Sequence, residues 1–301
     1  MPSRSSNFSN LIAPEISNAF FNKYNQWPDE YASVFNIESS SQAYEIDTEV
    51  TGLGQFVSKA EGNPIAYDDP IQGKRKTYTH ITYGLGFRVT NELYQDDLYG
   101  VIKKMPQALA RSAHQTIEVQ AWNIFNNAFN TGYPGLDGVN LIATNHPNVS
   151  GTGGPYSNRL STDADLSVTS LQAGVQLMEL VTDDRDLNMM IRPKLLVVST
   201  NQKWMARELL NSEFKPGTGD NEINAFKDED LSYMVSHYLT STHSWYLIAD
   251  KADHYLKFYW RQKLNMDNDD DFDTGDAKFK ATMRFSVGFS GWRGIVGSST
   301  G

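Results

Sequence analysis

The run KRKTYTHITY at residues 74–83 alternates threonine, tyrosine and isoleucine with basic and other polar side chains. Alternation of β-formers with polar residues at period two predicts a strand. A second strand-like run, EVTGLGQFV at 49–57, is interrupted by glycines. The turn-forming clusters GNP at 62–64 and DDPIQG at 68–73 lie between the two runs. Together these features predict a long β-hairpin over residues 47–84.

This hairpin lacks the side chains for a core of its own. Each limb of about fifteen residues would reach roughly 50 Å at the usual strand rise, and an isolated hairpin is marginally stable in water. We therefore expect another subunit to be its partner. The basic cluster Lys74, Arg75 and Lys76 fits a hairpin tip that forms salt bridges with a neighbour's acidic surface. Contact with nucleic acid is the alternative, but no aromatic residues are interleaved as single-strand binders require.

Residues 1–46 are polar and rich in Asn and Ser, with scattered aromatic residues. The segment is too apolar for a free tail and too irregular for a compact domain. Two interpretations stand side by side: an arm that lies on other surfaces, and a helical cap on the chain's own core. As an arm, it would offer Phe20, Phe21 and Trp27 as contacts between subunits.

Apolar residues recur at spacings of three and four between positions 98 and 128. This stripe predicts a long amphipathic helix over about 97–130, with Pro106 kinking it or splitting off a first segment. Residues 136–143 then indicate a short hairpin, and His146 a turn. A Gly/Pro/Asn/Ser-rich loop over 145–161 is expected to be a structural boundary.

Beyond that boundary, helical and strand patterns alternate, which predicts an α/β layer over 151–250. The expected elements are helices over 165–181 and up to Leu210, and strands over 193–199, 233–239 and 245–248. The strand-like segments 255–264 and 278–296 follow, with an acidic loop between them. The overall class is therefore α+β.

The composition and motifs exclude many kinds of active site. The chain of 301 residues has no cysteine, which excludes disulfides, Cys-ligated metals and thiol nucleophiles. Its six histidines are scattered, and the zinc-protease, nucleophile-elbow and phosphate-loop motifs are absent. The net charge of -10 disfavours a dedicated nucleic-acid reader, and no stretch has transmembrane length. We expect no catalytic residues, no cofactor and no membrane partner.

The sharpest polar feature is the run DNDDDFDTGD at 267–276. Calcium sites use several carboxylates at alternate positions around a glycine turn. Here the glycine is misplaced for that motif and no glutamate closes the loop, so a solvated acidic turn is the favoured interpretation. The alternative is a weak cation loop made by Asp267, Asp269, Asp271 and Asp273.

The order of these parts is unusual for an enzyme, and several segments carry a resemblance to a known family. They are YGLGFRVT (83–90), DDLYG (96–100), Pro106 with ALARSA (108–113), LDG (136–138), LIATNHP (141–147), FKATMRFSVG (279–288) and WRG (292–294). In this order and spacing they resemble the major capsid protein of tailed bacteriophages, which has the Hong Kong 97-type fold. More narrowly, they look like the Mu-like major head subunit group.

The resemblance implies a name and a role for each part of the chain. Residues 1–46 would be the N-terminal arm, 47–84 the extended loop and 151–250 the axial domain. Residues 85–150 and 251–301 would form the peripheral domain, with the helix as its spine. It further implies hexamers and pentamers in an icosahedral head, assembled in the host cytoplasm around double-stranded DNA that they contact non-specifically. A portal protein, and scaffold or decoration proteins, are the other implied partners.

Two other functions remain as alternatives. An encapsulin-like nanocompartment shell would share the fold but hold protein cargo. A hydrolase or carbohydrate-binding α+β protein would need convergent polar groups in a pocket, and the sequence offers no such set.

Overall fold

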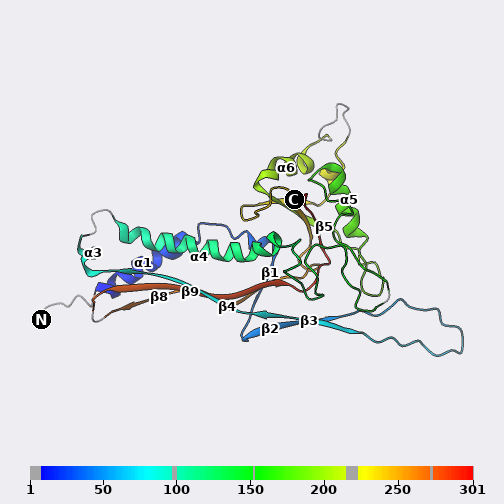
Figure 1. Ribbon diagram of the computed structural model, residues 1–301, viewed down its shortest axis with the longest axis horizontal. Helices are drawn as coiled ribbons and strands as arrows, with labels where there is room; N and C mark the ends of the chain where they lie inside the picture. Colours follow the sequence, from blue (N-terminus) through cyan, green and yellow to red (C-terminus); the bar gives the residue numbers. More distant parts are fainter. Residues whose placement is uncertain (1–7, 97–99, 152, 215–222, 272–273, 301) are drawn as a thin grey trace.

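The structure is a computed structural model that describes residues 8–96, 100–151, 153–214, 223–271 and 274–300. Its elements form an elongated body, a lobe at one end of that body and a thin hairpin that projects beyond both (Figure 1). The body holds a four-stranded sheet covered by helices, the lobe holds a second four-stranded sheet, and the hairpin is a separate two-stranded sheet. Within the described residues, no helix is both long and apolar enough to span a bilayer.

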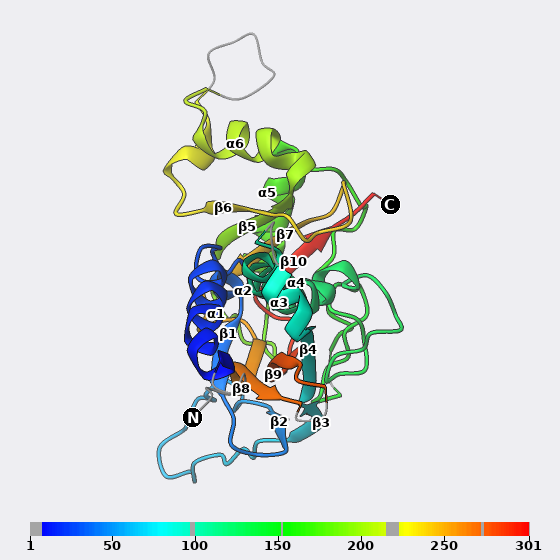
Figure 2. The same ribbon diagram turned by 90° about the vertical axis from the view of Figure 1, so that its left-hand side faces the viewer.

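The first sheet has the strand order β1-β8-β9-β4. Its strands are β1 (Asn36–Ser39), β4 (Ile81–Val89), β8 (Leu256–Asp270) and β9 (Ala277–Phe289). β8 and β9 form a long antiparallel pair, β4 joins β9 antiparallel, and β1 joins β8 in parallel. Seen end-on, the four strands lie beneath α1 (Phe8–Tyr24) and α4 (Val101–Asn126) (Figure 2). The sheet is therefore built from segments far apart in the sequence.

The core of the body lies between α4 and this sheet. Trp122 and Phe125 on α4 are fully buried, as are Phe258 on β8 and Phe285 on β9. The rings of Phe258 and Phe285 stack with centroids 5.1 Å apart. Each such side chain contributes about 1.5–3 kcal/mol through burial, which explains why the apolar stripe of α4 faces inward.

The predicted long helix is present, and Pro106 does not split it. α4 runs without interruption from Val101 to Asn126, and Pro106 is one of its buried residues. Pro106 is the sixth residue of α4 and removes only the one hydrogen bond that its own N–H would donate one turn back, so the rest of this long helix continues past it. Residues 97–99 lie outside the described part of the chain.

The N-terminal segment packs on its own subunit as a helical cap. α1 lies along α4 (Figures 1 and 2), followed by the short α2 (Tyr31–Val34) and then β1. The ring of Phe20 is fully buried in a cluster with Leu109 and Ala113 of α4. The expectation that Phe20 contacts another subunit is wrong for the folded subunit, because that ring already fills its own core.

The second sheet has the strand order β10-β7-β5-β6. Its strands are β5 (Pro193–Ser199), β6 (Ser232–Ser236), β7 (Trp245–Ala249) and β10 (Ile295–Ser298). The helices of this lobe are α5 (Val168–Glu179) and α6 (Lys203–Asn211), with the short turns η2 (Thr200–Gln202) and η3 (Ala225–Asp228). All five residues of β7 are buried. Trp245, Leu247 and Ala249 pack in the core of the lobe, and Tyr246 and Ile248 pack in the core of the body.

The C-terminal strand crosses from the body to the lobe. β10 pairs antiparallel with β7, so residues 251–301 do not all belong with the first sheet as expected. α3 (Asn91–Asp96) follows β4 at the other end of the body. Residues 136–143 form turns instead of the expected short hairpin, with Gly135 donating to the Val139 carbonyl at 2.7 Å.

The expected long hairpin is present but shorter than its sequence pattern indicates. β2 (Tyr44–Val50) pairs antiparallel with β3 (Gln72–Thr79), and residues 51–71 between them carry no regular strand. Residues 81–84, which we expected to continue the hairpin, begin β4 of the first sheet. The chain changes partner at His80, whose ring is buried between Ser40 and Ser286 with 3.0 Å to each hydroxyl.

Candidate functional site

The projecting hairpin presents an uncovered apolar face. Along β2 the side chains alternate: those of Tyr44, Ile46, Thr48 and Val50 are exposed, whereas Glu45, Asp47 and Glu49 are half-buried. In the loop beyond the strands, Phe56 and Tyr67 are almost wholly exposed, at 104% and 94%. Exposed apolar side chains on one projecting feature are typical of an interaction surface.

The basic cluster lies at the base of this hairpin and holds it to the body. Lys74 Nζ donates to the Asp137 carbonyl at 2.7 Å, and Lys76 Nζ donates to the Pro134 carbonyl at 2.8 Å. Arg75 is exposed. The expectation of a basic hairpin tip is wrong, because these residues lie within β3 and the tip lies in 51–71.

A second anchor lies on the opposite edge of the hairpin base. Lys257 of β8 binds the Asp47 carboxylate with N–O distances of 2.8 and 2.9 Å. Ser290 donates to the same carboxylate and also shares a hydrogen bond with the Tyr78 hydroxyl. A Cβ on Gly288 would come 2.5 Å from the Tyr78 ring, so glycine allows this buried tyrosine to lie flat on β9.

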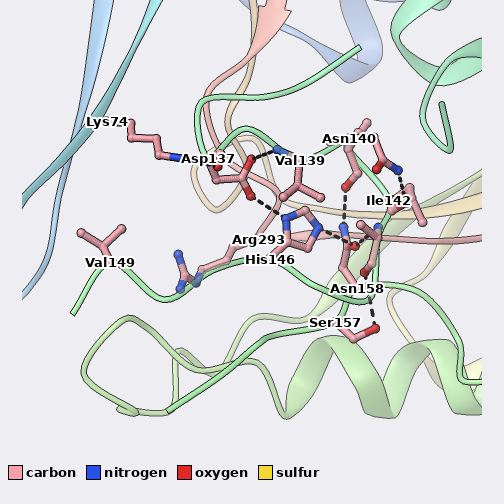
Figure 3. A network of polar contacts seen from close by, with 12 residues as sticks. Lys74, Asp137, Val139, Asn140, Ile142, His146, Val149, Ser157, Asn158 and Arg293 are labelled. Atoms are coloured by element: carbon pink, nitrogen blue, oxygen red, sulfur yellow. Dashed lines mark hydrogen bonds and ion pairs between the residues drawn. The ribbon is translucent and has the colours of Figure 1, made fainter. Parts of the chain in front are cut away.

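The loop that receives the two lysines is fixed by a buried polar network (Figure 3). His146 is fully buried; its Nδ1 lies 2.6 Å from Asp137 Oδ2 and its Nε2 3.1 Å from Asn158 Oδ1. Asn158 Nδ2 donates to the carbonyls of Leu141 and Ile295. His146, where the sequence predicts a turn, is therefore the centre of a rigid hydrogen-bonded network that joins this loop to β10. We call this network of Asp137, His146 and Asn158 the platform.

Aromatic stacking completes this platform. The rings of His146 and Trp292 stack with centroids 4.6 Å apart and planes 16° apart. The next residue, Arg293, lies over the same tryptophan ring at 4.8 Å and forms a buried ion pair with Asp184 at 2.9 Å. Its Nε donates to the Thr182 carbonyl, so Arg293 ties the platform to the lobe.

The carboxylate of Glu49 faces this platform. Its Oε2 atom is buried and has no hydrogen-bond partner among the described residues. It lies at the bulge where the β2–β3 register shifts. Burial, followed by the negative charge of Asp184, raises the pKa of Glu49 to about 7. The hairpin base is therefore sensitive to proton concentration near neutral pH.

We expect Glu49→Gln to change how stability depends on pH. The pKa is about 7 in the folded subunit and 4.5 in the reference state, so folding favours the protonated form. The contribution of Glu49 to the free energy of unfolding is fully present below pH 4.5 and is lost as pH rises through 7. The amide cannot ionise, so the advantage of the variant over wild type should grow by about 1 kcal/mol between pH 5 and pH 8, after allowance for solvent screening.

Urea unfolding at a series of pH values measures this advantage. Glu61→Gln, which changes an exposed carboxylate in the hairpin loop, is the matched control and should leave the wild-type profile unchanged. A stability difference between Glu49→Gln and wild type that stays constant from pH 5 to pH 8 would contradict this account of Glu49.

The acidic run divides between a strand and the expected turn: its first four residues end β8 at Asp270, and beyond them Gly275 N donates to the Asp271 carbonyl at 2.8 Å. Asp267 and Asp269 lie in β8 and pair in register with Lys280 and Lys278 of β9. Lys278 also binds Asp271 at 2.6 Å. The alternate carboxylates thus face a row of lysines, which removes the geometric basis for a cation loop, and Asp273 lies outside the described residues.

The remaining candidates for contact between subunits, Phe21 and Trp27, are half-buried on the N-terminal segment. Trp27 lies 5.8 Å from the His114 ring of α4. Beside it, Asp29, His114 and Glu118 form the one cluster of three metal-ligand side chains found within the described residues. The one signal of this cluster in the sequence is the spacing of His114 and Glu118 by four residues, which places them on one helix face; Asp29 is joined to them only by the fold.

Comparison with known proteins agrees with this architecture. Residues 74–298 match the family model described as phage capsid protein. The fold is similar to that of the capsid of the native GTA particle, at 11% identity and a TM-score of 0.57 over 89% of this chain and 88% of that one. It is also similar to a structure from Mycobacterium phage Adephagia, at 10% identity and a TM-score of 0.56 over 91% and 90%.

A third similar structure is the capsid of bacteriophage JBD30 decorated with minor capsid protein trimers. Identity is 17% and the TM-score 0.55, over 71% of this chain and 92% of that one. No curated protein sequence matches the chain. The expected α+β capsid fold of the Hong Kong 97 type is confirmed. With three quarters of its length covered by the family model, the chain belongs to the phage capsid protein family and is a structural subunit of a phage head.

Proposed function

We propose that this subunit assembles into hexamers and pentamers of an icosahedral head that encloses double-stranded DNA. The observation that carries the proposal is the hairpin, which is held rigidly at its base and presents exposed apolar residues, including Phe56 and Tyr67, at its far end. A subunit in water gains nothing from such a surface. In a shell, the neighbouring subunit covers it and gains the free energy of apolar burial.

We assign each part of the chain the role that the capsid resemblance implies, with its bounds adjusted to the observed strands. Residues 47–80 are the extended loop, 151–250 with β10 the axial domain, and 81–150 with the rest of 251–301 the peripheral domain. Residues 1–46 are the N-terminal arm, whose helix α1 lies on α4 of its own subunit. Phe21, Trp27 and Arg75 are the retained candidates for contact with neighbours, since none of them is fully buried.

The role we propose is mechanical, without catalysis or a cofactor, and the site is the virion, with assembly in the host cytoplasm. The net charge of -10 supports contact with packaged DNA that is weak and independent of sequence. A portal protein, a scaffold, and decoration proteins of the kind present on the JBD30 capsid are the partners we propose.

The contents of purified particles test this function. Shells should protect double-stranded DNA from added nuclease and release it when the shells are opened with denaturant. Shells that contain a folded enzyme and no DNA would point to an encapsulin-like nanocompartment instead. Subunits that stay compact and monomeric, with residues 51–71 protected from protease, would contradict any shell function.

A further inference from the structure

Three side chains that are suited to bind a metal meet where the N-terminal segment lies on α4. They are Asp29, from the turn before α2, and His114 and Glu118, from successive turns of α4. One ligand atom from each lies within 4.8 Å of the others. The cluster therefore joins segments that are more than 80 residues apart in the chain.

The distances in this cluster are those of ligands around a shared ion. His114 Nε2 lies 3.5 Å from Asp29 Oδ1 and 3.9 Å from Glu118 Oε1. Zinc bonds of 2.0–2.2 Å place tetrahedral ligand atoms about 3.4 Å apart. Both separations are long for a hydrogen bond, but a small adjustment of the Asp29 side chain would close the set around one cation.

His114 supplies the second, independent observation. Its side chain is 8% exposed, and Nε2 forms no hydrogen bond of normal geometry with a described residue; it has only the long ion-pair contacts with Asp29 and Glu118. A buried polar atom that is not fully hydrogen-bonded costs about 1–3 kcal/mol, so such atoms are rare unless a ligand satisfies them. This nitrogen points at the two carboxylates, which is where an ion would lie.

The surroundings hold these ligands in place. Glu118 is fully buried, and its oxygens accept hydrogen bonds from the Glu30 backbone at 2.7 Å and from Trp122 Nε1 at 3.0 Å. The rings of Tyr24 and Trp27 lie 6.0 and 5.8 Å from the His114 ring. Metal-ligating histidines and carboxylates are oriented by contacts of this kind.

We propose that Asp29, His114 and Glu118 bind one divalent transition-metal ion of the zinc class, which fastens the N-terminal segment to α4. One imidazole and two carboxylates suit zinc better than magnesium or calcium, which prefer oxygen ligands alone. Asp29 is 41% exposed, so an ion can enter from solvent, and water can fill the fourth position. The site is independent of shell assembly and needs no neighbouring subunit.

Zinc binding by the full-length, unassembled subunit tests the site. After removal of metals with a chelator, equilibrium dialysis against zinc chloride should give one zinc ion per chain, and the melting temperature should rise by several degrees. Cobalt in place of zinc should give the visible absorption of a four-coordinate site. Failure of the wild-type chain to bind zinc stoichiometrically would overturn the proposal.

Variants locate the ion. Asp29→Asn changes a partly exposed side chain and should lower zinc affinity at least tenfold while the fold is kept; His114→Gln should abolish both binding and the cobalt spectrum. His243→Gln is the matched control, because His243 and Asp165 form an exposed pair 2.9 Å apart without a third ligand. Binding that survives His114→Gln and Asp29→Asn, or that is lost equally in His243→Gln, would refute the assignment.

Discussion

Replacing Phe56 and Tyr67 together with aspartate is expected to give a folded subunit that no longer forms closed shells. Both side chains are almost wholly exposed in the subunit, so their replacement should change its unfolding free energy by less than about 0.5 kcal/mol. In the shell each aromatic ring would bury about 150–250 Å² against a neighbour. Aspartate loses that burial and adds an unpaired charge to the interface, at a further cost of several kcal/mol.

The loss is repeated at every contact of the shell, so the yield of closed particles should fall to background. Size-exclusion chromatography with electron microscopy measures the yield, and circular dichroism verifies the fold. The conservative pair Phe56→Tyr and Tyr67→Phe keeps both rings and should assemble like wild type. Normal shells from the double aspartate variant would show that the hairpin end is not covered by a neighbour.

Of the substitutions proposed here, His146→Ala is expected to lower the free energy of unfolding of the subunit most, by about 3–5 kcal/mol. The imidazole is fully buried, stacks on Trp292 and binds both Asp137 and Asn158. Its removal creates a cavity and takes a hydrogen-bond partner from two buried polar side chains. The platform under the hairpin lysines should loosen as a result.

Urea unfolding of the unassembled subunit measures this loss. His146→Phe separates the two causes, since it keeps a stacked ring but cannot bind Asp137, and should still lose about 2 kcal/mol. His243→Ala, at an exposed histidine, should change stability by less than about 0.5 kcal/mol. A loss at His146 no greater than at His243 would show that the buried network contributes little.

Elements with a regular apolar pattern could be predicted from the sequence to within about four residues at each end. The stripe of α4 indicated a helix over about 97–130, and the helix spans Val101–Asn126. The buried run at 193–199 coincides with β5. In both cases a local period reports which face is buried, so no knowledge of distant segments is needed.

Elements whose stability comes from distant partners could not be predicted in this way. Asp267 and Asp269 have low strand propensity and indicated a turn, but opposite lysines of β9 stabilise them in a strand. The crossing of β10 into the second sheet leaves no local pattern. The same holds for the Asp137–His146–Asn158 network, because its members meet only after the loops fold.

The hairpin illustrates both cases. Its alternating residues indicated strands, and its polar composition indicated a need for a partner, which the exposed Phe56 and Tyr67 support. The basic residues were misplaced at its tip, because only the fold shows that Lys74 and Lys76 reach carbonyl oxygens of the loop at 134–137. Charge in a sequence does not reveal which surface it faces.

The central claim is that this subunit holds its neighbours through the projecting hairpin. Cryo-electron microscopy of particles formed by the full-length chain tests it most directly. We predict closed icosahedral shells in which residues 51–71 of each subunit lie on an adjacent subunit, with Phe56 and Tyr67 covered. Shells in which these residues lie on their own subunit or remain in solvent would contradict it.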